Sequence, residues 1–434
     1  MVQPSSHPLF RFRWLIFSIL ALAYFFVYFH RLSLSVVADN LIQDFNTSAG
    51  TLGLLGSIYF YCYAAMQLPA GLLSDSVGPR RTVTWFLMAA SAGSILFGLA
   101  PNIETAVVGR ILVGFGVSMV FIPTMKILSQ WYYPHEFAFM AGILNAIGGA
   151  GVMAATWLLA MMTVAVGWRI SFELIGGVTF VIAFLAWLII RDRPQDKGWP
   201  AIADLNDKSG RPAGPPPSTP LLAGVRQVVG NRHFWPLALW FFFDCGIFFG
   251  FGGLWGGPFL MHVYGLSREA AGTVLSMIAW GMIIGSPLLG FVSDRLLRSR
   301  KKPFIGCSAV LAVEMGALYF FPASLSRPML YAAFFVFAVC ASAIVAIGFT
   351  ATKELFPVEI AGTSVGTVNL FPFLGGAVYM PMLGNILDAY PRQASGAYAM
   401  GGYKSMLLVL FISALIALIC ASLMKETYRA GERP

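Results

Sequence analysis

Long apolar blocks separated by short polar stretches dominate the chain. A helix needs about 20 apolar residues to cross a hydrocarbon core of about 30 Å, and twelve blocks approach or exceed that length. The expected spans are 13–38, 48–71, 82–100, 104–127, 139–164, 168–190, 234–262, 268–291, 303–322, 328–351, 361–388 and 402–424. The pattern therefore predicts an all-α polytopic membrane protein with twelve transmembrane helices.

One long polar stretch separates the sixth block from the seventh. Residues 191–233 are rich in proline, glycine and charge, and they include the run GRPAGPPPSTP. Such a composition does not bury a core, so we interpret it as a cytoplasmic linker. The expected division is an N-terminal six-helix half at 1–190, the linker, and a C-terminal six-helix half at 234–434.

Composition agrees with a membrane protein and narrows the function classes. Hydrophobic residues make up 58% of the chain and charged residues only 11%, whereas soluble domains carry about 25% charged residues. The net charge of +9 is interpreted as loop cations rather than as a nucleic-acid surface. The five cysteines show no metal-ligand spacing, and the apolar blocks contain no nucleophile with a base or paired carboxylates. Neither an enzyme, a cofactor nor a metal site is predicted.

The distribution of cations predicts the orientation. If the N-terminus is inside, most of the 28 Lys and Arg residues fall on the inner side. The outer connections then hold only Arg169, Arg268, Arg327, Arg392 and Lys404. By the positive-inside rule both termini are expected to be cytoplasmic, in a multi-pass protein of the cell inner (plasma) membrane.

A charged loop occurs twice, about half the chain length apart. Gly71–Arg81 reads GLLSDSVGPRR, and Gly290–Lys302 reads GFVSDRLLRSRKK. Each combines a glycine, a serine and aspartate, and a basic cluster between two apolar blocks. This spacing indicates duplication, with two six-helix halves in parallel.

These loops resemble the loop 2 to 3 signature of the major facilitator superfamily, G-x-L-x-D-R-x-G-R-R. The first copy departs from it at Ser76 and Pro79. The stretch Arg110–Gly116 is similar to the family pattern R-x-x-x-G-x-G in helix 4. The resemblance implies two six-helix halves that rock about a central site.

The first loop is a candidate conformational latch. One carboxylate and two guanidiniums between two spans can form ion pairs that exist in only one arrangement of the halves. The resemblance implies that they hold the cytoplasmic side closed when the outer side is open. The alternative is that the cations only anchor an inner loop; Arg110 is expected to make structural contacts or, as in some exporters, to serve proton coupling. The candidate latch residues are Gly71, Asp75, Gly78, Arg80, Arg81, Arg110, Asp294 and Arg295.

A polar face in helix 1 is the candidate substrate site. At 100° per residue, Tyr24, Tyr28 and Arg31 share one face, with Ser35 one turn further along. An arginine fork beside hydroxyl groups can bind a carboxylate bidentately. Alternatively, Arg31 lies near the outer end of the helix and reaches to the lipid headgroups. Further polar contacts are expected from Asn145, Asn369 and Tyr379.

Residues 28–36, YFHRLSLSV, are also similar to the helix 1 stretch Y-x-D-R-x-x-L-S-V of the anion:cation symporter branch. The resemblance implies that Arg31 contacts an anionic substrate. His30 stands where that branch has an acidic residue, so the local ion pair of the branch is absent.

Three titratable residues inside the apolar blocks are candidates for proton coupling. Asp244 lies among phenylalanines in helix 7, and an isolated carboxyl there can load and release a proton. Its alternative is a carboxylate near the inner mouth that bonds to the backbone. His30 and Glu314 are the weaker candidates.

The sequence thus predicts a monomeric secondary transporter that couples protons to the uptake of a small organic anion by alternating access. A proton-driven exporter of amphipathic compounds is the alternative within transport. Helix 5 lacks the proline of the exporter signature, which disfavours that alternative. A non-transporting membrane receptor is the alternative from another class. The expected partners are the anion, protons and the lipid bilayer, with no nucleic acid.

Overall fold

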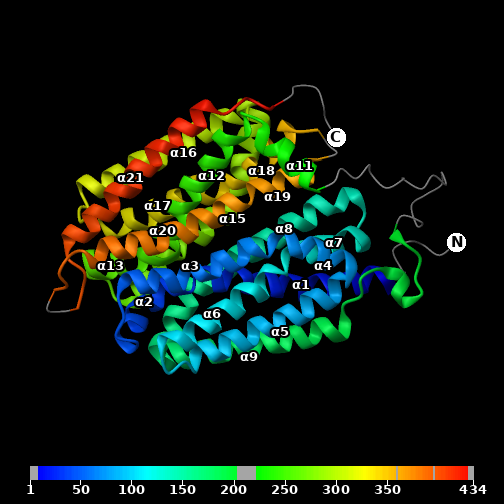
Figure 1. Cartoon of the computed structure of the whole chain (residues 1–434), viewed down its shortest axis with the longest axis horizontal. Helices are drawn as coiled ribbons and strands as arrows, with labels where there is room; N and C mark the ends of the chain where they lie inside the picture. Colours follow the sequence, from blue (N-terminus) through cyan, green and yellow to red (C-terminus); the bar gives the residue numbers. More distant parts are fainter. Residues whose placement is uncertain (1–7, 203–220, 358–359, 394–395, 429–434) are drawn as a thin grey trace. The chain divides into compact units, whose positions relative to one another are not determined.

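The computed structural model describes residues 8–202, 221–357, 360–393 and 396–428. Within them the chain forms the helices drawn in Figure 1. Taken in chain order, these helices group into twelve bodies that correspond to the twelve spans expected from the sequence. Several bodies consist of two helices with a break between them. The first four are α1 (Pro8–Leu32) with α2 (Leu34–Asp44), α3 (Ala49–Ala65) with α4 (Gln67–Ser76), α5 (Pro79–Gly98), and α6 (Ile103–Ser118) with α7 (Phe121–Trp131). The fifth consists of α8 (Pro134–Met153), the π-helical turn η2 (Ala154–Leu158) and the beginning of α9 (Leu159–Ile189). The rest of α9 forms the sixth.

The second six follow two short helices, η3 (Pro194–Lys197) and α11 (Leu221–Gly230). They are α12 (Phe234–Ile247) with η4 (Phe248–Trp255) and α13 (Gly256–Tyr264), α14 (Arg268–Leu275) with α15 (Met277–Phe291) and η5 (Val292–Leu297), α16 (Lys301–Phe320), α17 (Arg327–Ala338) with η6 (Val339–Ala343) and α18 (Val345–Leu355), α19 (Ala361–Val368) with α20 (Leu370–Asp388), and α21 (Met400–Leu423). Long helices with apolar exposed side chains such as Trp85, Val313 and Phe320 suit a lipid-facing exterior.

Local sequence signals explain where the helices begin and turn. Pro79 is the first residue of α5 and follows Gly78, whose φ of 95° suits a residue without a Cβ atom. Asn102 caps α6 by accepting a hydrogen bond from the Thr105 amide at 2.9 Å. Gly167, with φ 82°, joins the fifth and sixth bodies in a single residue inside α9.

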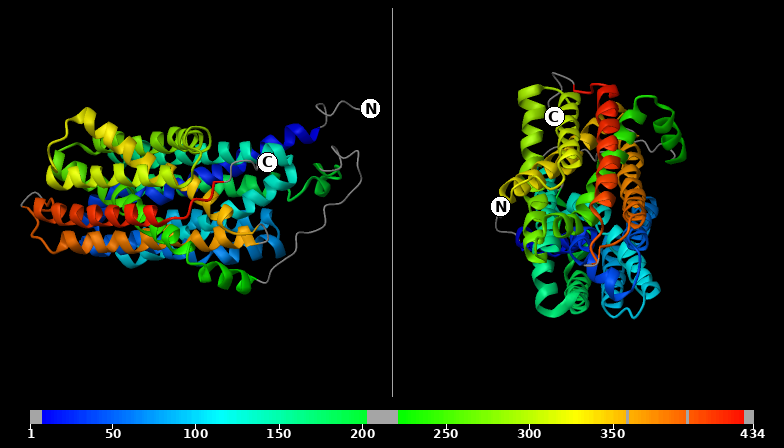
Figure 2. Two further views of the ribbon diagram at one scale, coloured as in Figure 1. Left: turned by 90° about the horizontal axis from the view of Figure 1, so that it is seen from above. Right: turned by 90° about the vertical axis from the view of Figure 1, so that its left-hand side faces the viewer.

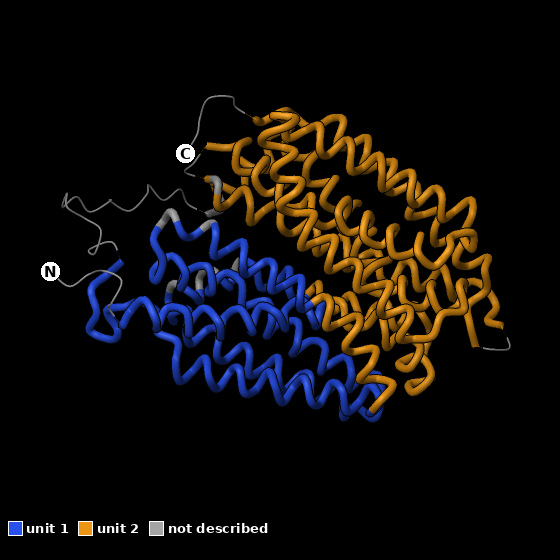
Figure 3. Tube along the Cα trace, turned by 180° about the vertical axis from the view of Figure 1, so that it is seen from behind, with its two compact units in different colours: residues 1–31, 62–151, 166–215 blue, residues 32–61, 152–165, 216–434 orange. Residues whose placement is uncertain are grey.

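The chain folds into two compact units that do not follow the predicted halves (Figure 3). Unit 1 comprises residues 1–31, 62–151 and 166–215, and unit 2 comprises 32–61, 152–165 and 216–434. Parts of the first, second and fifth bodies therefore group with the second half of the chain. The division into halves describes the sequence repeat, and it stays a prediction.

Small residues allow close helix packing within each unit. In unit 1, α5 packs on α6, and a Cβ atom at Gly93 would lie 2.6 Å from the Gly109 carbonyl oxygen. In unit 2, α12 packs against both α20 and α21, and α21 also packs against α16 (Figure 1). Figure 2 shows α21, in red, beside α20, in orange.

Candidate functional site

Arg31 lies in the last turn of α1, buried inside unit 1. Its side chain faces two aromatic rings, with the guanidinium carbon 4.6 Å from the centre of Tyr28 and 5.1 Å from the centre of Tyr63. Both rings present their electron-rich faces to the cation. The end of a helix also favours a positive charge. Because Arg31 is only 8% exposed, the alternative in which it reaches the lipid headgroups does not describe this structure.

The two tyrosines of the predicted face lie beside Arg31 as expected. The rings of Tyr24 and Tyr28 meet edge to face, with centres 5.3 Å apart. The Tyr24 hydroxyl donates to the Asn145 amide oxygen of α8 at 3.3 Å. A Cβ atom at Gly148 would lie 2.8 Å from the Tyr28 ring, so this glycine leaves the room that the ring occupies. Four predicted substrate residues are therefore brought together in unit 1: Tyr24, Tyr28, Arg31 and Asn145.

The other three predicted substrate residues belong to unit 2. Ser35 is fully buried in α2, beyond the break that follows α1. The Tyr379 hydroxyl donates to Ser413 of α21 at 2.5 Å, so its polar end is engaged inside the unit. Asn369 lies at the junction of α19 and α20 and is partly exposed. The role of each in substrate binding stays a prediction.

Asp244 is fully buried in α12 of unit 2. Its carboxyl oxygens accept no hydrogen bond from the described residues. The alternative in which it bonds to backbone does not describe this structure. Cys340 of η6 lies within electrostatic range of both Asp244 and Glu314 of α16. Since an ionised carboxylate without donors is costly to bury, the neutral acid is the cheaper form at this position.

His30 and Arg110 form a structural contact in unit 1. Both are buried, and the Arg110 guanidinium donates to the His30 backbone carbonyl at 3.2 Å. Arg110 also faces Phe97, in the last turns of α5, whereas Arg80 lies in the first turn of the same helix. Arg110 thus makes contacts near the end of α5 that is away from the loop. Its assignment to the latch stays a prediction.

The first charged loop is bound to the end of α9. The Arg80 amide donates to Asp192 at 2.6 Å, and its guanidinium donates to the Trp187 carbonyl at 3.1 and 2.5 Å. Burial raises the pKa of Asp192, and the hydrogen bond from the Arg80 amide opposes that rise. Gly78 allows this approach, since a Cβ atom there would lie 2.5 Å from the Asp192 carboxylate. Arg81 is exposed, and the side chains at positions 71 and 75, Gly71 and Asp75, lie outside the described part.

In the second copy of the loop, Arg300 makes the described ion pairs, and the latch role of Arg295 stays a prediction. Arg295 is exposed, while Arg300 pairs with Asp294 and holds Glu354 at 2.8 Å. Glu426, just after α21, accepts hydrogen bonds from the Arg300 amide at 2.8 Å and the Lys301 amide at 3.3 Å. Burial acts to raise the pKa of Glu426, but the hydrogen bonds it accepts outweigh burial and hold the pKa below its usual value.

Sequence reasoning missed Tyr63, Asp192 and Glu426. Asp192 and Glu426 make equivalent contacts, because each follows the last helix of a six-helix half and caps the helix after the charged loop. The position of Tyr63 beside Arg31 depends on how α3 is rotated, which the sequence does not show. No group of three or more metal-ligating side chains occurs in the described ranges.

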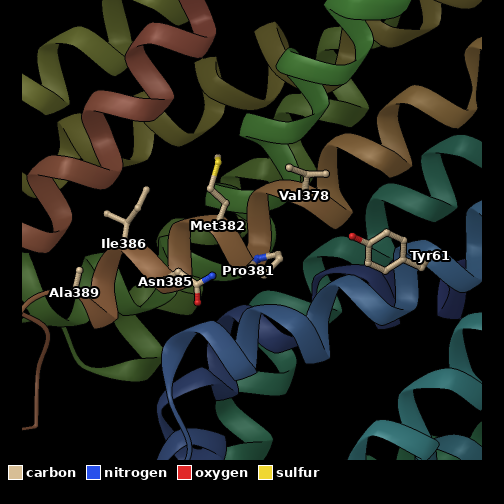
Figure 4. Close-up of a pocket in the computed structure, with 7 residues that line it drawn as sticks. All are labelled: Tyr61, Val378, Pro381, Met382, Asn385, Ile386 and Ala389. Atoms are coloured by element: carbon tan, nitrogen blue, oxygen red, sulfur yellow. The ribbon is translucent and has the colours of Figure 1, made fainter.

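A shallow hollow of about 600 Å³ lies on unit 2 beside α20 (Figure 4). Tyr61 of α3 faces it, together with side chains along α20. The lining residues are Tyr61, Val378, Pro381, Met382, Asn385, Ile386 and Ala389. It includes none of the predicted substrate or proton-coupling residues, so we do not assign the site to it.

Comparison with known proteins places the chain in a family. The sequence model of the Major Facilitator Superfamily matches residues 20–380 and 246–434. The membrane sensor protein UhpC of Escherichia coli (strain K12) is 24% identical, over 91% of this chain and 90% of that protein. The probable sulfoacetate transporter SauU of Cupriavidus necator is 25% identical, over 89% of each. The probable galactarate/D-glucarate transporter GarP of Escherichia coli (strain K12) is 23% identical, over 94% of this chain and 93% of that protein.

Solved structures share the fold. A bacterial homologue of the human lysosomal transporter Spinster, inward-facing and unoccupied, matches with a TM-score of 0.74 and 20% identity, over 95% of this chain and 98% of that one. The D-xylose–proton symporter matches with a TM-score of 0.73 and 15% identity, over the same shares. The chain therefore belongs to the Major Facilitator Superfamily of secondary transporters, and it is not an enzyme.

Proposed function

We propose that the protein takes up a small organic anion together with protons, by alternating access, as a monomer in the cell inner membrane with both termini cytoplasmic. One observation carries the proposal: the Arg31 guanidinium is buried in the last turn of α1 against the rings of Tyr28 and Tyr63, with Tyr24 beside Tyr28. These aromatic surroundings hold the guanidinium in place. Its N–H donors can bind the carboxylate of a transported anion.

The arginine fork fits an anion with two adjacent oxygen atoms. A guanidinium presents parallel N–H donors that match a carboxylate or a similar oxyanion. The Tyr24 hydroxyl and the Asn145 amide, which already bond to each other, lie on the same side of α1 and can bind hydroxyl or carbonyl groups of the cargo. The relatives SauU and GarP are named as probable transporters of sulfoacetate and of galactarate or D-glucarate, which are small carboxylate-bearing anions.

Asp244 supports the coupling to protons. A buried carboxyl with no hydrogen-bond donor among the described residues can exchange its proton when a conformational change admits water. Glu314 shares its neighbour Cys340 and is the second candidate, ahead of His30. His30 is enclosed by the rings of Phe26 and Phe29, which leaves it a packing role.

Transport into proteoliposomes tests the proposal. Purified protein is reconstituted, an inward proton gradient is imposed, and uptake of radiolabelled sulfoacetate, D-glucarate, galactarate and a hexose phosphate is measured. We expect gradient-dependent accumulation of at least one anion. Uptake by the Arg31→Ala variant should be at least about tenfold lower than uptake by the wild type, because the loss of one charge-assisted hydrogen bond weakens binding by about tenfold or more.

Two controls give this result its meaning. Arg327→Ala removes an exposed cation at the start of α17 and should leave uptake unchanged. Arg31→Lys keeps the charge without the fork and should fall between the wild type and Arg31→Ala. If no anion in the panel accumulates, the uptake proposal fails, and if Arg31→Ala transports normally, the helix 1 site is wrong.

A membrane sensor is the second candidate, because one relative is named as such. A sensor would bind the anion, as seen by a ligand-dependent rise in melting temperature, but would show no counterflow exchange in the same vesicles. If the protein were instead an exporter of amphipathic compounds, it should bind and transport lipophilic cations in preference to anions.

A further inference from the structure

The surroundings of Arg31 in unit 1 are largely aromatic. Its guanidinium carbon lies 4.6 Å from the ring centre of Tyr28 and 5.1 Å from that of Tyr63. Tyr24 meets Tyr28 edge to face, and Phe121 of α7 stacks on Tyr24 with ring centres 5.5 Å apart. The cation is therefore accompanied by aromatic rings from α1, α3 and α7.

Helix α8 approaches these rings closely and offers them an amide group. Asn145 accepts the hydrogen bond of the Tyr24 hydroxyl at 3.3 Å. Gly148 lies one turn further along α8, and a Cβ atom there would lie 2.8 Å from the Tyr28 ring. Tyr28 and Phe121 are half-buried and Asn145 is exposed, so part of this aromatic surface remains accessible to a ligand.

The charges at membrane depth fit a cargo with one negative charge. Apart from residues at the ends of the expected spans, the Lys and Arg residues that the sequence places inside them are Arg31 and Arg110. Arg110 donates to the His30 backbone carbonyl at 3.2 Å and so serves the packing of unit 1. A second negative charge on the cargo would therefore lack a lysine or arginine of its own inside the spans, and such a charge is costly there.

We propose that the Arg31 site prefers a monoanion with a planar apolar ring, of the aromatic monocarboxylate class, over polyhydroxy acids and dianions. One carboxylate matches the guanidinium fork, and an aromatic body packs against the faces and edges of the surrounding rings. A polyhydroxy chain against the same rings would lose hydrogen bonds to water without gaining equivalent partners. The preference rests on the proposed function only for the assignment of Arg31 to an anion, and it names the class of cargo.

Binding to purified protein in detergent near neutral pH, with no gradient, tests the preference. Four probes separate charge from polarity: benzoate is a singly charged aromatic acid, terephthalate a doubly charged aromatic acid, D-gluconate a singly charged polyhydroxy acid and D-glucarate a doubly charged polyhydroxy acid. Isothermal titration calorimetry gives the dissociation constants. Benzoate should bind roughly tenfold more tightly than each of the other three, because a lost aromatic contact or an unpaired charge changes affinity by about this factor.

Two variants connect the preference to the rings. Phe121→Leu removes a ring without changing any charge, and it should weaken benzoate binding by about two- to tenfold. Tyr24→Phe keeps the ring and removes the hydroxyl, so benzoate binding should stay at the wild-type value. Phe180→Leu is the matched control, since Phe180 is an exposed phenylalanine on α9 of the same unit. It should leave the dissociation constant for benzoate unchanged.

Each part of the preference has a result that contradicts it. Equal or tighter binding of D-gluconate or D-glucarate than of benzoate would overturn the apolar ring, and the same result with terephthalate would overturn the single charge. Equal effects of Phe121→Leu and Phe180→Leu, or of Phe121→Leu and Tyr24→Phe, would overturn the role of the rings, as would the absence of binding by all four probes. Failure of gradient-driven uptake alters none of these constants, so the two proposals fail separately.

Discussion

Arg31 shows how much of a site a helical repeat can predict. Spacing alone placed Tyr24 and Tyr28 on its face, and the structure confirms that placement. Spacing says nothing of neighbouring helices, so Tyr63, the second ring beside the guanidinium, was missed. The same limit explains why Asp39 and His262, which lie 223 positions apart, were not paired from the sequence.

Tyr63 provides a residue-scale prediction about the cation site. Tyr63→Phe keeps the ring face over Arg31 and should bind the transported anion nearly as well as the wild type. Tyr63→Leu removes the ring and should weaken apparent affinity by about two- to thirtyfold, because one cation–π contact stabilises by about 0.5 to 2 kcal/mol. The KM for uptake measures both. Equal losses in the two variants would show that the hydroxyl, and not the ring, matters.

At the scale of elements, the two helices that follow the charged loops are capped in the same way. Each receives at its start an acidic side chain from just beyond the last helix of its half, Asp192 on α5 and Glu426 on α16. The repeated loops were recognisable in the sequence because they combine glycine with clustered charge. Their partners were not, because a single acidic residue after an apolar block occurs in many cytoplasmic loops.

The Glu426 cap predicts a pH dependence of stability. Its pKa in the folded protein lies below the usual value, so its contribution is present above pH of about 4.3 and is lost as pH falls through the lower, folded pKa. Glu426→Gln should therefore lower the melting temperature by about 1 to 3 °C at pH 7. The difference from the wild type should shrink below pH of about 4.3. Melting curves of detergent-solubilised protein measure it, and a difference that stays constant down to pH 3.5 would contradict the cap.

At the scale of the whole molecule, the sequence predicted the twelve-helix fold but not the grouping of helices into units. The length of the hydrophobic blocks and the cations of the loops are sufficient to predict the twelve-helix fold. The grouping into units depends on which helix ends are in contact in one conformation. A hydropathy pattern does not show such contacts, for example those of Asp388 with α3. A transporter has at least two such groupings, and a single sequence must be compatible with both.

Coupling between protons and cargo is likewise a property of the whole molecule. The Asp244→Asn variant tests it. Asp244→Asn keeps the size of the side chain but fixes it as neutral. Gradient-driven accumulation should fall to the level without a gradient, while counterflow exchange of the anion should stay within about twofold of the wild type. Asp196→Asn, at an exposed position of η3, is the control. Loss of exchange as well as accumulation would indicate that Asp244 serves the structure or the cargo instead.

The chain passes between its two units inside helices rather than only at loops. Three crossings lie close to the break after α1, to the π-helical turn η2, and to Gly167 in α9. The regular hydrogen-bond ladder is already interrupted at such points, so bending there disrupts fewer bonds. A substitution that favours regular helix at one of these points should therefore slow turnover without altering any side chain that contacts the cargo.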